Sequence, residues 1–355
     1  MTQVTLETRT QSWTGWKSFS LTQTLDNAYQ TLSMETTDRF QEGLARWDVE
    51  GGTAIRLSFD NNPVFYGYIT GYSPKIAEGT HSINLSAKSD LYDLVKSSHV
   101  GTIAWRDTTP EEIIQEVLDP FNIPVVFESG MTAIGAEGFR IAANSSPYSI
   151  IKRLAERDGL LAVSYRDLAV IVTDNPSFAS PPPITLGVWC EISANHDVSK
   201  SHSEIILKTQ RKSFNNDFDD KQSVEQRVEN PSVTRYTPLV ILETSDIGQQ
   251  ESFADYVNRR FLGNSVTATV KVKSFFDPNG QLWLVGSRVF VNEPLVDINQ
   301  ELIISSVTFA LSESDGISTT LELKVPGTYS TNGGTSPAAA RRGTGAFGNL
   351  LGALI

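Results

Sequence analysis

The sequence predicts a mainly β fold with an α+β insertion, in which two similar antiparallel β-barrel domains flank a small α+β domain. Alternating apolar and polar residues, as in "AIRLSFD" and "HSINLSAK", fill both ends of the chain. Two short segments in the middle have helical spacing instead. At 355 residues, the chain is also longer than one hydrophobic core usually serves.

The first predicted domain, residues 1–100, is a β barrel whose turn "DNNP" separates two strand-like runs. Side chains of a regular strand alternate between two faces, so the run "PVFYGYITGY" at 63–72 is expected to place Tyr66, Tyr68 and Tyr72 on one face. A row of tyrosines on a monomer would lie against water. We therefore predict that these tyrosines form an interaction surface covered by a neighbouring barrel.

The second predicted domain, residues 101–180, is a small α+β unit. In "TPEEIIQEVL", Thr109 is the expected N-cap and Glu112 closes a capping box, with apolar residues following on one helical face. The segment "SPYSIIKRLA" repeats this plan from Ser146, again with proline at the first helical position. Strand-like text follows each helix, which indicates two helices packed on a small sheet.

The proline-rich run "NPSFASPPPITLG" marks a boundary, and residues 184–329 are predicted to form the second β barrel, with one helix at about 250–262. Segments 68–88 and 306–324 both read as a strand, an acidic turn ending in glycine and a second alternating strand. This likeness favours two barrels built on one design.

Residues 330–355 are predicted to be a flexible C-terminal tail, because the segment before the last residues is rich in Gly, Ser, Thr and Ala. Phe347, Leu350, Leu351 and Leu354 would form one apolar stripe if the end of the tail were helical, which makes it a candidate docking peptide. The alternative is a mobile terminus with scattered leucines.

Charge and composition restrict the function classes. The formal net charge of −12 has the wrong sign for a surface that binds nucleic acid by contacting phosphates, although a passage for nucleic acid would tolerate it. The first residues, "MTQVTLETRT", do not resemble a secretory signal, and no apolar run is long enough to span a bilayer. The single cysteine, Cys190, excludes an intramolecular disulfide.

No catalytic, cofactor or metal site is predicted. The tail contains a G-x-G-x-x-G spacing, but a dinucleotide site needs a strand before it and a helix of a βαβ unit after it. Cys190, His196 and His202 lie six residues apart, whereas zinc ligands usually come in close pairs. There is no G-x-S-x-G nucleophile elbow.

Two other function classes remain as alternatives at this point. One is a hydrolase acting on cell-wall glycan, whose paired carboxylates the sequence does not reveal. The other is a carbohydrate-binding module in which Trp13, Trp16 or Trp283 stacks on sugar rings, although single aromatic residues in alternating strands more often belong to a core.

The chain resembles the baseplate hub proteins of Mu-like contractile-tailed phages. The resemblance runs through about residues 1–329 and rests on the order and spacing of several segments, which are "VFYGYITGYSPKIAEGTHSINLSAKSDLYDLVKSS", "TPEEIIQEVLDPFNIPV", "VTRYTPLVI", "GQLWLVGSRVFVNEP" and "ELIISSVTFALSESDGISTTLELKVPGTY". It implies a structural, non-enzymatic virion protein and a homotrimeric ring of pseudo-sixfold symmetry, related to rings in type VI secretion spikes and tail-like bacteriocins.

The resemblance also implies the partners of such a ring. These are the central spike protein, the tail tube or tube-initiator protein, and baseplate wedge proteins. The ring would join the sixfold tube to the threefold spike and leave a passage for DNA, without specific nucleic-acid binding and without a membrane span. The implied location is the tail baseplate of the virion, assembled in the cytoplasm of the bacterial host.

Overall fold

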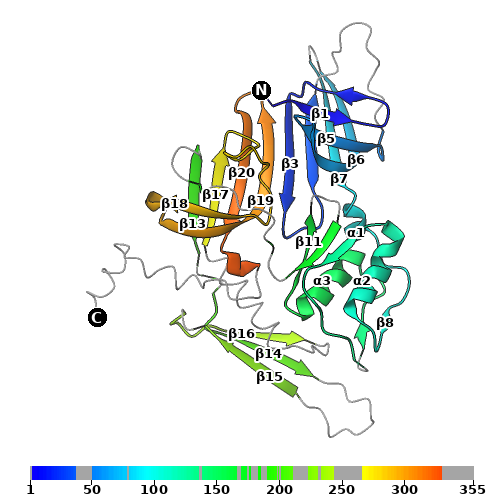
Figure 1. Ribbon diagram of the computed structural model, residues 1–355, viewed down its shortest axis with the longest axis vertical. Coiled ribbons are helices and arrows are strands. Elements are labelled where there is room, and N and C mark those ends of the chain that lie inside the picture. Colours follow the sequence, from blue (N-terminus) through cyan, green and yellow to red (C-terminus); the bar gives the residue numbers. More distant parts are fainter. Residues whose placement is uncertain are drawn as a thin grey trace, which may run out of the picture.

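The computed structural model confirms the mainly β fold with a small α+β region between two β regions (Figure 1). It describes residues 2–36, 50–77, 80–135, 138–165, 169–173, 183–184, 190–197, 201–210, 223–230, 233–243 and 266–329, with Pro176 and Ser199. The helix predicted at about 250–262 and the tail from 330 lie outside these residues. None of the described helices is both long and apolar enough to cross a bilayer.

The first β region contains seven strands, whose alternating burial follows the alternating sequence. They are β1 (Val4–Glu7), β2 (Ser12–Trp13), β3 (Ser18–Thr24), β4 (Thr31–Thr36), β5 (Ala54–Phe59), β6 (Asn62–Ala77) and β7 (Thr80–Ser89). Asp60 and Asn61 connect β5 to β6 with positive φ angles of 47° and 66°. Asp and Asn tolerate this backbone conformation, so the predicted "DNNP" turn is confirmed as a tight hairpin.

The α+β region has its own hydrophobic core beneath two capped helices. Its elements are α1 (Tyr92–Lys96), β8 (Ala104–Trp105), α2 (Pro110–Leu118), η1 (Asp119–Phe121), β9 (Val125–Phe127), β10 (Phe139–Arg140), α3 (Pro147–Arg157), β11 (Leu161–Tyr165) and β12 (Ala169–Thr173). The Thr109 side chain and the Glu112 backbone N–H form the predicted capping box, and Ser146 caps α3. Both predicted helices are therefore confirmed.

The second β region contributes strands to two sheets. Its elements are β13 (Glu191–His196), β14 (Glu204–Gln210), β15 (Ser223–Glu229), β16 (Pro238–Glu243), β17 (Val266–Val272), β18 (Arg288–Glu293), η2 (Pro294–Val296), β19 (Ile298–Ser312), β20 (Gly316–Lys324) and η3 (Pro326–Thr328). Strands β15, β14 and β16 form a separate three-stranded sheet, inserted between β13 and β17.

The two β regions repeat one strand order. The first region pairs in the order β3-β4-β7-β6-β5, and the second in the order β13-β17-β20-β19-β18. Strands β6 and β19 each carry a bulge at the corresponding place, at Thr70 and Ser305. Each bulge hydroxyl donates a hydrogen bond to the facing strand, from Thr70 to the Ser86 carbonyl (3.2 Å) and from Ser305 to the Glu322 carbonyl (2.9 Å). The observed pairing supports the predicted common design.

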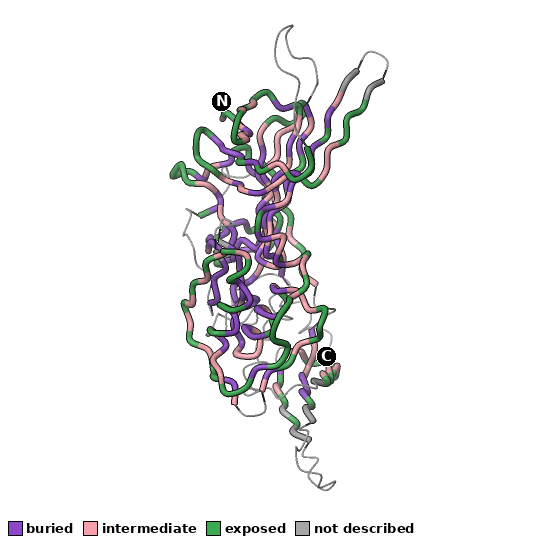
Figure 2. The backbone as a smooth tube through the Cα atoms, turned by 90° about the vertical axis from the view of Figure 1, so that its right-hand side faces the viewer, coloured by how far each residue is buried: buried purple, intermediate pink, exposed green. Residues whose placement is uncertain are grey.

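The repeats are joined in one sheet, because β19 pairs with β3 through six directly opposed residue pairs. Among the described strands, the pairing follows one open path and does not close a barrel within either repeat. Both repeats also share a single core, which forms the buried middle of the molecule in Figure 2.

Four phenylalanines lie at the centre of this shared core. Phe19 and Phe59 come from the first repeat, and Phe275 and Phe309 from the second. The Phe59 and Phe275 rings stack with centroids 4.4 Å apart, and Phe309 lies edge-on to both at 5.4 and 5.6 Å. Aromatic pairs in such geometry add to the free energy of burial, so this cluster stabilises the contact between the repeats.

Replacing Phe59 with alanine is expected to lower the free energy of unfolding by about 3–5 kcal/mol, because it leaves a cavity facing three other rings. Urea unfolding followed by tryptophan fluorescence would measure the change. Phe290→Ala, at an exposed position of β18, is the matched control and should cost less than about 1 kcal/mol. Equal losses for both variants would contradict the central role of the cluster.

Candidate assembly surfaces

The tyrosines of β6 do not share one face, so that part of the prediction is wrong. The bulge at Thr70 inserts one residue into the alternation. Beyond it, Tyr72 stands opposite buried Leu85 and packs against the shared core, while Tyr66 and Tyr68 precede the bulge. Counting by twos along a sequence assumes a regular strand, which is why the bulge was missed.

Tyr68 contacts helix α1 of the same chain, and its covering by a neighbouring barrel stays a prediction. Its hydroxyl donates a hydrogen bond to Asp93 Oδ1 at 2.7 Å. Burial, followed by this hydrogen bond, raises the pKa of the Tyr68 hydroxyl well above its usual value. The Tyr29 and Tyr92 rings meet edge-to-face nearby, at 4.8 Å. The hydrogen bond between Tyr68 and Asp93 ties the first repeat to the α+β region.

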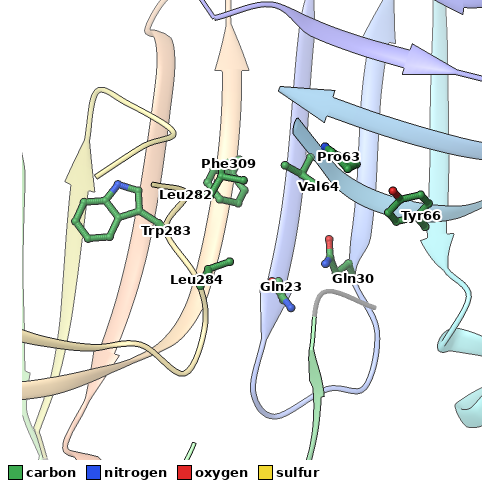
Figure 3. Close-up of a pocket in the computed structure, with 9 residues that line it drawn as sticks. All are labelled: Gln23, Gln30, Pro63, Val64, Tyr66, Leu282, Trp283, Leu284 and Phe309. Atoms are coloured by element: carbon green, nitrogen blue, oxygen red, sulfur yellow. The ribbon is translucent and has the colours of Figure 1, made fainter. Parts of the chain in front are cut away.

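Tyr66 lines a small cavity between the two repeats. The cavity has a volume of about 90 Å³ and is bordered by Gln23, Gln30, Pro63, Val64, Tyr66, Leu282, Trp283, Leu284 and Phe309 (Figure 3). Strands β3 and β6 and the β17–β18 connection all contribute to its wall. Pockets that bind small organic ligands are typically several times larger, at about 300 Å³ or more, so this cavity suits a few water molecules.

The tryptophans proposed for sugar binding belong to the protein interior. Trp283 is 2% exposed, and Trp16 is buried with its Nε1 donating to the Val4 carbonyl at 3.1 Å. Trp13 is partly buried and packs against the shared core. Ring faces that are packed in a core cannot stack on a glycan, so this arrangement does not favour the carbohydrate-binding alternative.

The three residues considered as metal ligands each contact a different backbone carbonyl. Cys190 contacts the Lys271 carbonyl, His196 the Val296 carbonyl and His202 the Thr237 carbonyl. Within the described ranges, no three His, Cys, Asp or Glu side chains are grouped so as to hold a metal ion. The predicted lack of catalytic, cofactor and metal residues stays a prediction for the whole chain.

Hydroxyl side chains cover the face of the large sheet that points away from the core. Residues paired in register form one row across eight strands: Glu191, Lys271, Thr320, Thr308, Thr22, Thr31, Lys88 and Tyr68. A neighbouring row is formed by Ser318, Ala310, Ser20, Ser33, Ser86 and Gly71. At the centre, Thr22 Oγ1 and Thr308 Oγ1 lie 3.1 Å apart. This hydroxyl face is therefore polar, and Glu191, Lys271 and Lys88 are the charged members of these two rows.

The same eight strands end in two edges that have no partner among the described strands. One is the outer edge of β13, and the other is the part of β6 beyond its contacts with β5 and with Gly52 and Thr53, residues 70–77. Unpaired strand edges expose backbone donors and acceptors and commonly pair with another chain. The apolar residues of the candidate docking peptide, Phe347, Leu350, Leu351 and Leu354, lie outside the described residues.

The contact between Tyr68 and Asp93 is expected to couple the two side chains by about 1–2 kcal/mol, because one partner is charged and partly buried. A double-mutant cycle of Tyr68→Phe and Asp93→Ala, read by urea unfolding, would measure it. The uncoupled control combines Tyr68→Phe with Asp60→Ala, because the Asp60 carboxylate accepts instead from the Gln3 backbone N–H. Additive losses in the first cycle would show that the hydrogen bond contributes nothing.

Comparisons with known proteins match this architecture. Residues 3–89 match the family model of the N-terminal domain of Mu phage GpP-like baseplate assembly proteins, and residues 92–173 match the second domain of gp44-like baseplate hub proteins. The baseplate hub protein gp44 of Escherichia phage Mu is 24% identical over 336 residues, covering 90% of this chain and 87% of that protein.

Solved structures show the same fold. The 43 kDa tail protein of prophage MuSo2 from Shewanella oneidensis superimposes with a TM-score of 0.80 at 20% identity, covering 92% of this chain and 99% of that one. An Escherichia coli type VI secretion component has a TM-score of 0.59 at 12% identity, covering 94% and 79%. The resemblance inferred from the sequence is confirmed: residues 3–89 and 92–173 match two domain models of Mu-type baseplate proteins, and the chain resembles a phage Mu hub protein over most of its length.

Proposed function

We propose that this chain is the structural baseplate hub of a contractile phage tail, in which three copies form a closed ring between the sixfold tail tube and the threefold central spike. The observation that carries the proposal is the duplicated sheet, in which the outer edge of β13 and residues 70–77 of β6 have no strand partner among the described residues. The matches to hub domains support the same conclusion. We infer that the ring belongs to the virion baseplate and is assembled in the host cytoplasm beside wedge proteins.

The pairing of β19 with β3 within one chain, the internal junction, supplies a template for the contact between copies. Strand β19 of the second repeat pairs with β3 of the first, with Thr308 opposite Thr22. Counted from the shared bulge, Ser73 of β6 takes the place of Thr308. Counted through the neighbouring strands, Asn195 of β13 takes the place of Thr22. Strand β6 of one copy would therefore pair with β13 of the next, with Ser73 opposite Asn195.

Such a contact joins different surfaces of the two copies, so it propagates from copy to copy until a ring closes. Each copy supplies two similar repeats, and three copies would give six similar segments around one axis. The number three follows from the resemblance to known hubs. Pro74 lies in the part of β6 that would pair with β13 of the next copy. Because proline has no backbone N–H, at most one hydrogen-bond donor is missing from this part of the contact.

In the closed ring, the hydroxyl face would line the central passage, because the opposite face of the sheet is buried in the shared core. Threonine and serine hydroxyls hold water and carry no charge. Because hydroxyl groups make up most of these rows, the counterion-driven attraction of DNA by basic residues would be limited within them to Lys88 and Lys271. The net charge of −12 also disfavours the attraction of DNA to the protein.

A disulfide between copies tests the proposed ring. In a Cys190→Ser background, Ser73→Cys together with Asn195→Cys is expected to give covalent dimers and trimers on a non-reducing gel, because the template places these residues side by side. The mass of the full-length protein in solution, measured at micromolar concentration, should correspond to three chains.

The junction itself provides the matched control. Thr22→Cys together with Thr308→Cys should form a disulfide within one chain, because the two hydroxyl oxygens are 3.1 Å apart, and should leave the gel mass of a single chain. If this control is oxidised while the first pair remains reduced, strand pairing between copies is excluded. A protein that stays monomeric with the spike present would exclude the ring.

Deleting residues 341–355 is expected to leave the folded body intact and to weaken attachment to a partner, because it removes the apolar residues of the candidate docking peptide. Co-purification of the spike and tube proteins would measure attachment, and thermal unfolding would report on the body. Replacing Leu350, Leu351 and Leu354 with serine is the matched variant and should have the same effect. Unchanged co-purification for both variants would reject the docking role.

A further inference from the structure

We propose that Lys88 of one copy forms an ion pair with Asp197 of the next copy, so that charge as well as strand pairing holds each contact of the ring. This inference rests on the proposed ring and adds a side-chain contact that would set the strength of its closure. It follows from the internal junction, where the equivalent lysine of the second repeat makes such a pair within the chain.

Lys88 and Lys324 occupy equivalent positions in the two repeats. Lys88 of β7 stands opposite Tyr68, and Lys324 of β20 stands opposite Ile303. Tyr68 and Ile303 each lie two residues before the bulge of their strand. Counting through the neighbouring strands gives the same match. Because Lys88 belongs to the hydroxyl face, its counterpart Lys324 lies on that face too.

Lys324 pairs with a carboxylate across the internal junction. Its Nζ lies 3.2 Å from Asp26 Oδ2, and Asp26 belongs to the turn that follows β3. The Tyr329 hydroxyl donates to the same carboxylate oxygen at 3.1 Å and accepts from Lys324 Nζ at 3.2 Å. The lysine therefore links the second repeat to the first across the paired strands β19 and β3.

Lys88 has the aromatic contacts of its counterpart but lacks the carboxylate. Its Nζ lies 4.9 Å from the centre of the Tyr29 ring and 5.7 Å from the centre of the Tyr92 ring. Lys324 Nζ likewise lies 5.6 Å from the centre of the Tyr329 ring. Among the described residues, Lys88 forms no ion pair, and burial lowers the pKa of its ammonium group. A carboxylate supplied by another copy would stabilise this partly buried charge.

The end of β13 offers a carboxylate at the matching place. Asp197 directly follows β13, and counting along the strands gives it the place of Thr24 at the end of β3. Asp197 Oδ1 accepts from the Ser199 N–H at 2.8 Å, and Thr24 Oγ1 accepts from the Asp26 N–H at 3.3 Å, so both connections begin alike. A carboxylate accepts several hydrogen bonds, so Asp197 can bind this N–H and an ammonium group together.

The proposed strand pairing brings the two charges within reach. With Ser73 opposite Asn195, Asp197 of the next copy lies opposite Gly71, which pairs with the residue two positions before Lys88. Two strand spacings and this offset separate the Cα atoms of Lys88 and Asp197 by roughly 12 Å. Gly71 has no side chain between them, and the long, flexible stem of lysine can cross the gap. The pair would also neutralise an ammonium group that would otherwise attract DNA phosphates in the passage.

The two edges carry opposite charges farther along the contact as well. Lys75 is the charged residue of the free part of β6, residues 70–77, and β13 begins with Glu191. In the proposed register, Lys75 faces Ser193, and Glu191 is its diagonal neighbour on the same face. Diagonal pairs on a sheet are within reach of long side chains. Basic groups on one edge and acidic groups on the other favour pairing of unlike edges over pairing of like edges.

Charge reversal in the full-length protein would test this ion pair. Lys88→Glu and Asp197→Lys are made singly and together. Analytical ultracentrifugation at low and high salt then measures the midpoint concentration, at which half of the chains are trimeric. The matched control is Lys152→Glu on helix α3, which makes the same charge change at an exposed ion pair and should shift the midpoint by less than about twofold. Thermal unfolding checks that each variant is folded, and Asp197→Lys tests the pair independently of Lys88→Glu.

Each single reversal should raise the midpoint concentration by about tenfold at low salt, because three attractions in each ring become repulsions, and high salt should reduce this effect. The double variant should return the midpoint to within about twofold of that of the parent. A double variant as weak as its single variants would overturn the ion pair. A parent that stays a single chain at every concentration would refute the ring itself, whereas a trimer insensitive to both reversals would refute only the ion pair.

Discussion

The pairing of β19 with β3 is the constraint on which the rest of this structure depends. It places two repeats in one sheet and gives them one core, with four phenylalanines packed where the repeats meet. Separate barrels could move independently and could meet at many angles. Because the repeats share backbone hydrogen bonds and a close-packed core, the angle between them is fixed within each chain. In a ring built from such chains, half of the contacts between neighbouring repeats would already be formed within each chain.

The sheet also explains why the protein would assemble. One face of it is buried, the other bears hydroxyl groups, and both β13 and residues 70–77 of β6 leave backbone groups without strand partners among the described residues. Water can satisfy these groups, so the free energy gained by pairing two edges is modest for each hydrogen bond. A specific contact then depends on many bonds formed in register, and the internal junction shows that the register is compatible with this backbone.

The sequence was informative wherever structure is decided by neighbouring residues. The capping box at Thr109, the cap at Ser146 and the turn at Asp60 follow from local hydrogen bonds and allowed φ angles, and all were predicted. Features decided by distant residues were missed. The pairing of β19 with β3 joins residues almost three hundred positions apart, as at Thr22 and Thr308. Among the described strands, the two repeats predicted as separate barrels therefore share one sheet.

The bulges at Thr70 and Ser305 show how the repeats stay alike while their surroundings differ. Before each bulge the strand pairs with β5 or β18, and beyond it the strand continues into a hairpin of the large sheet. The extra residue bends the strand between these two differently paired parts. In both repeats, the bulge hydroxyl donates a hydrogen bond to the facing carbonyl. The bend is thus held by local contacts in each repeat. Insertions beyond the ends of β7 and β13 do not disturb it, so the two repeats keep one strand order although the connections between their strands differ.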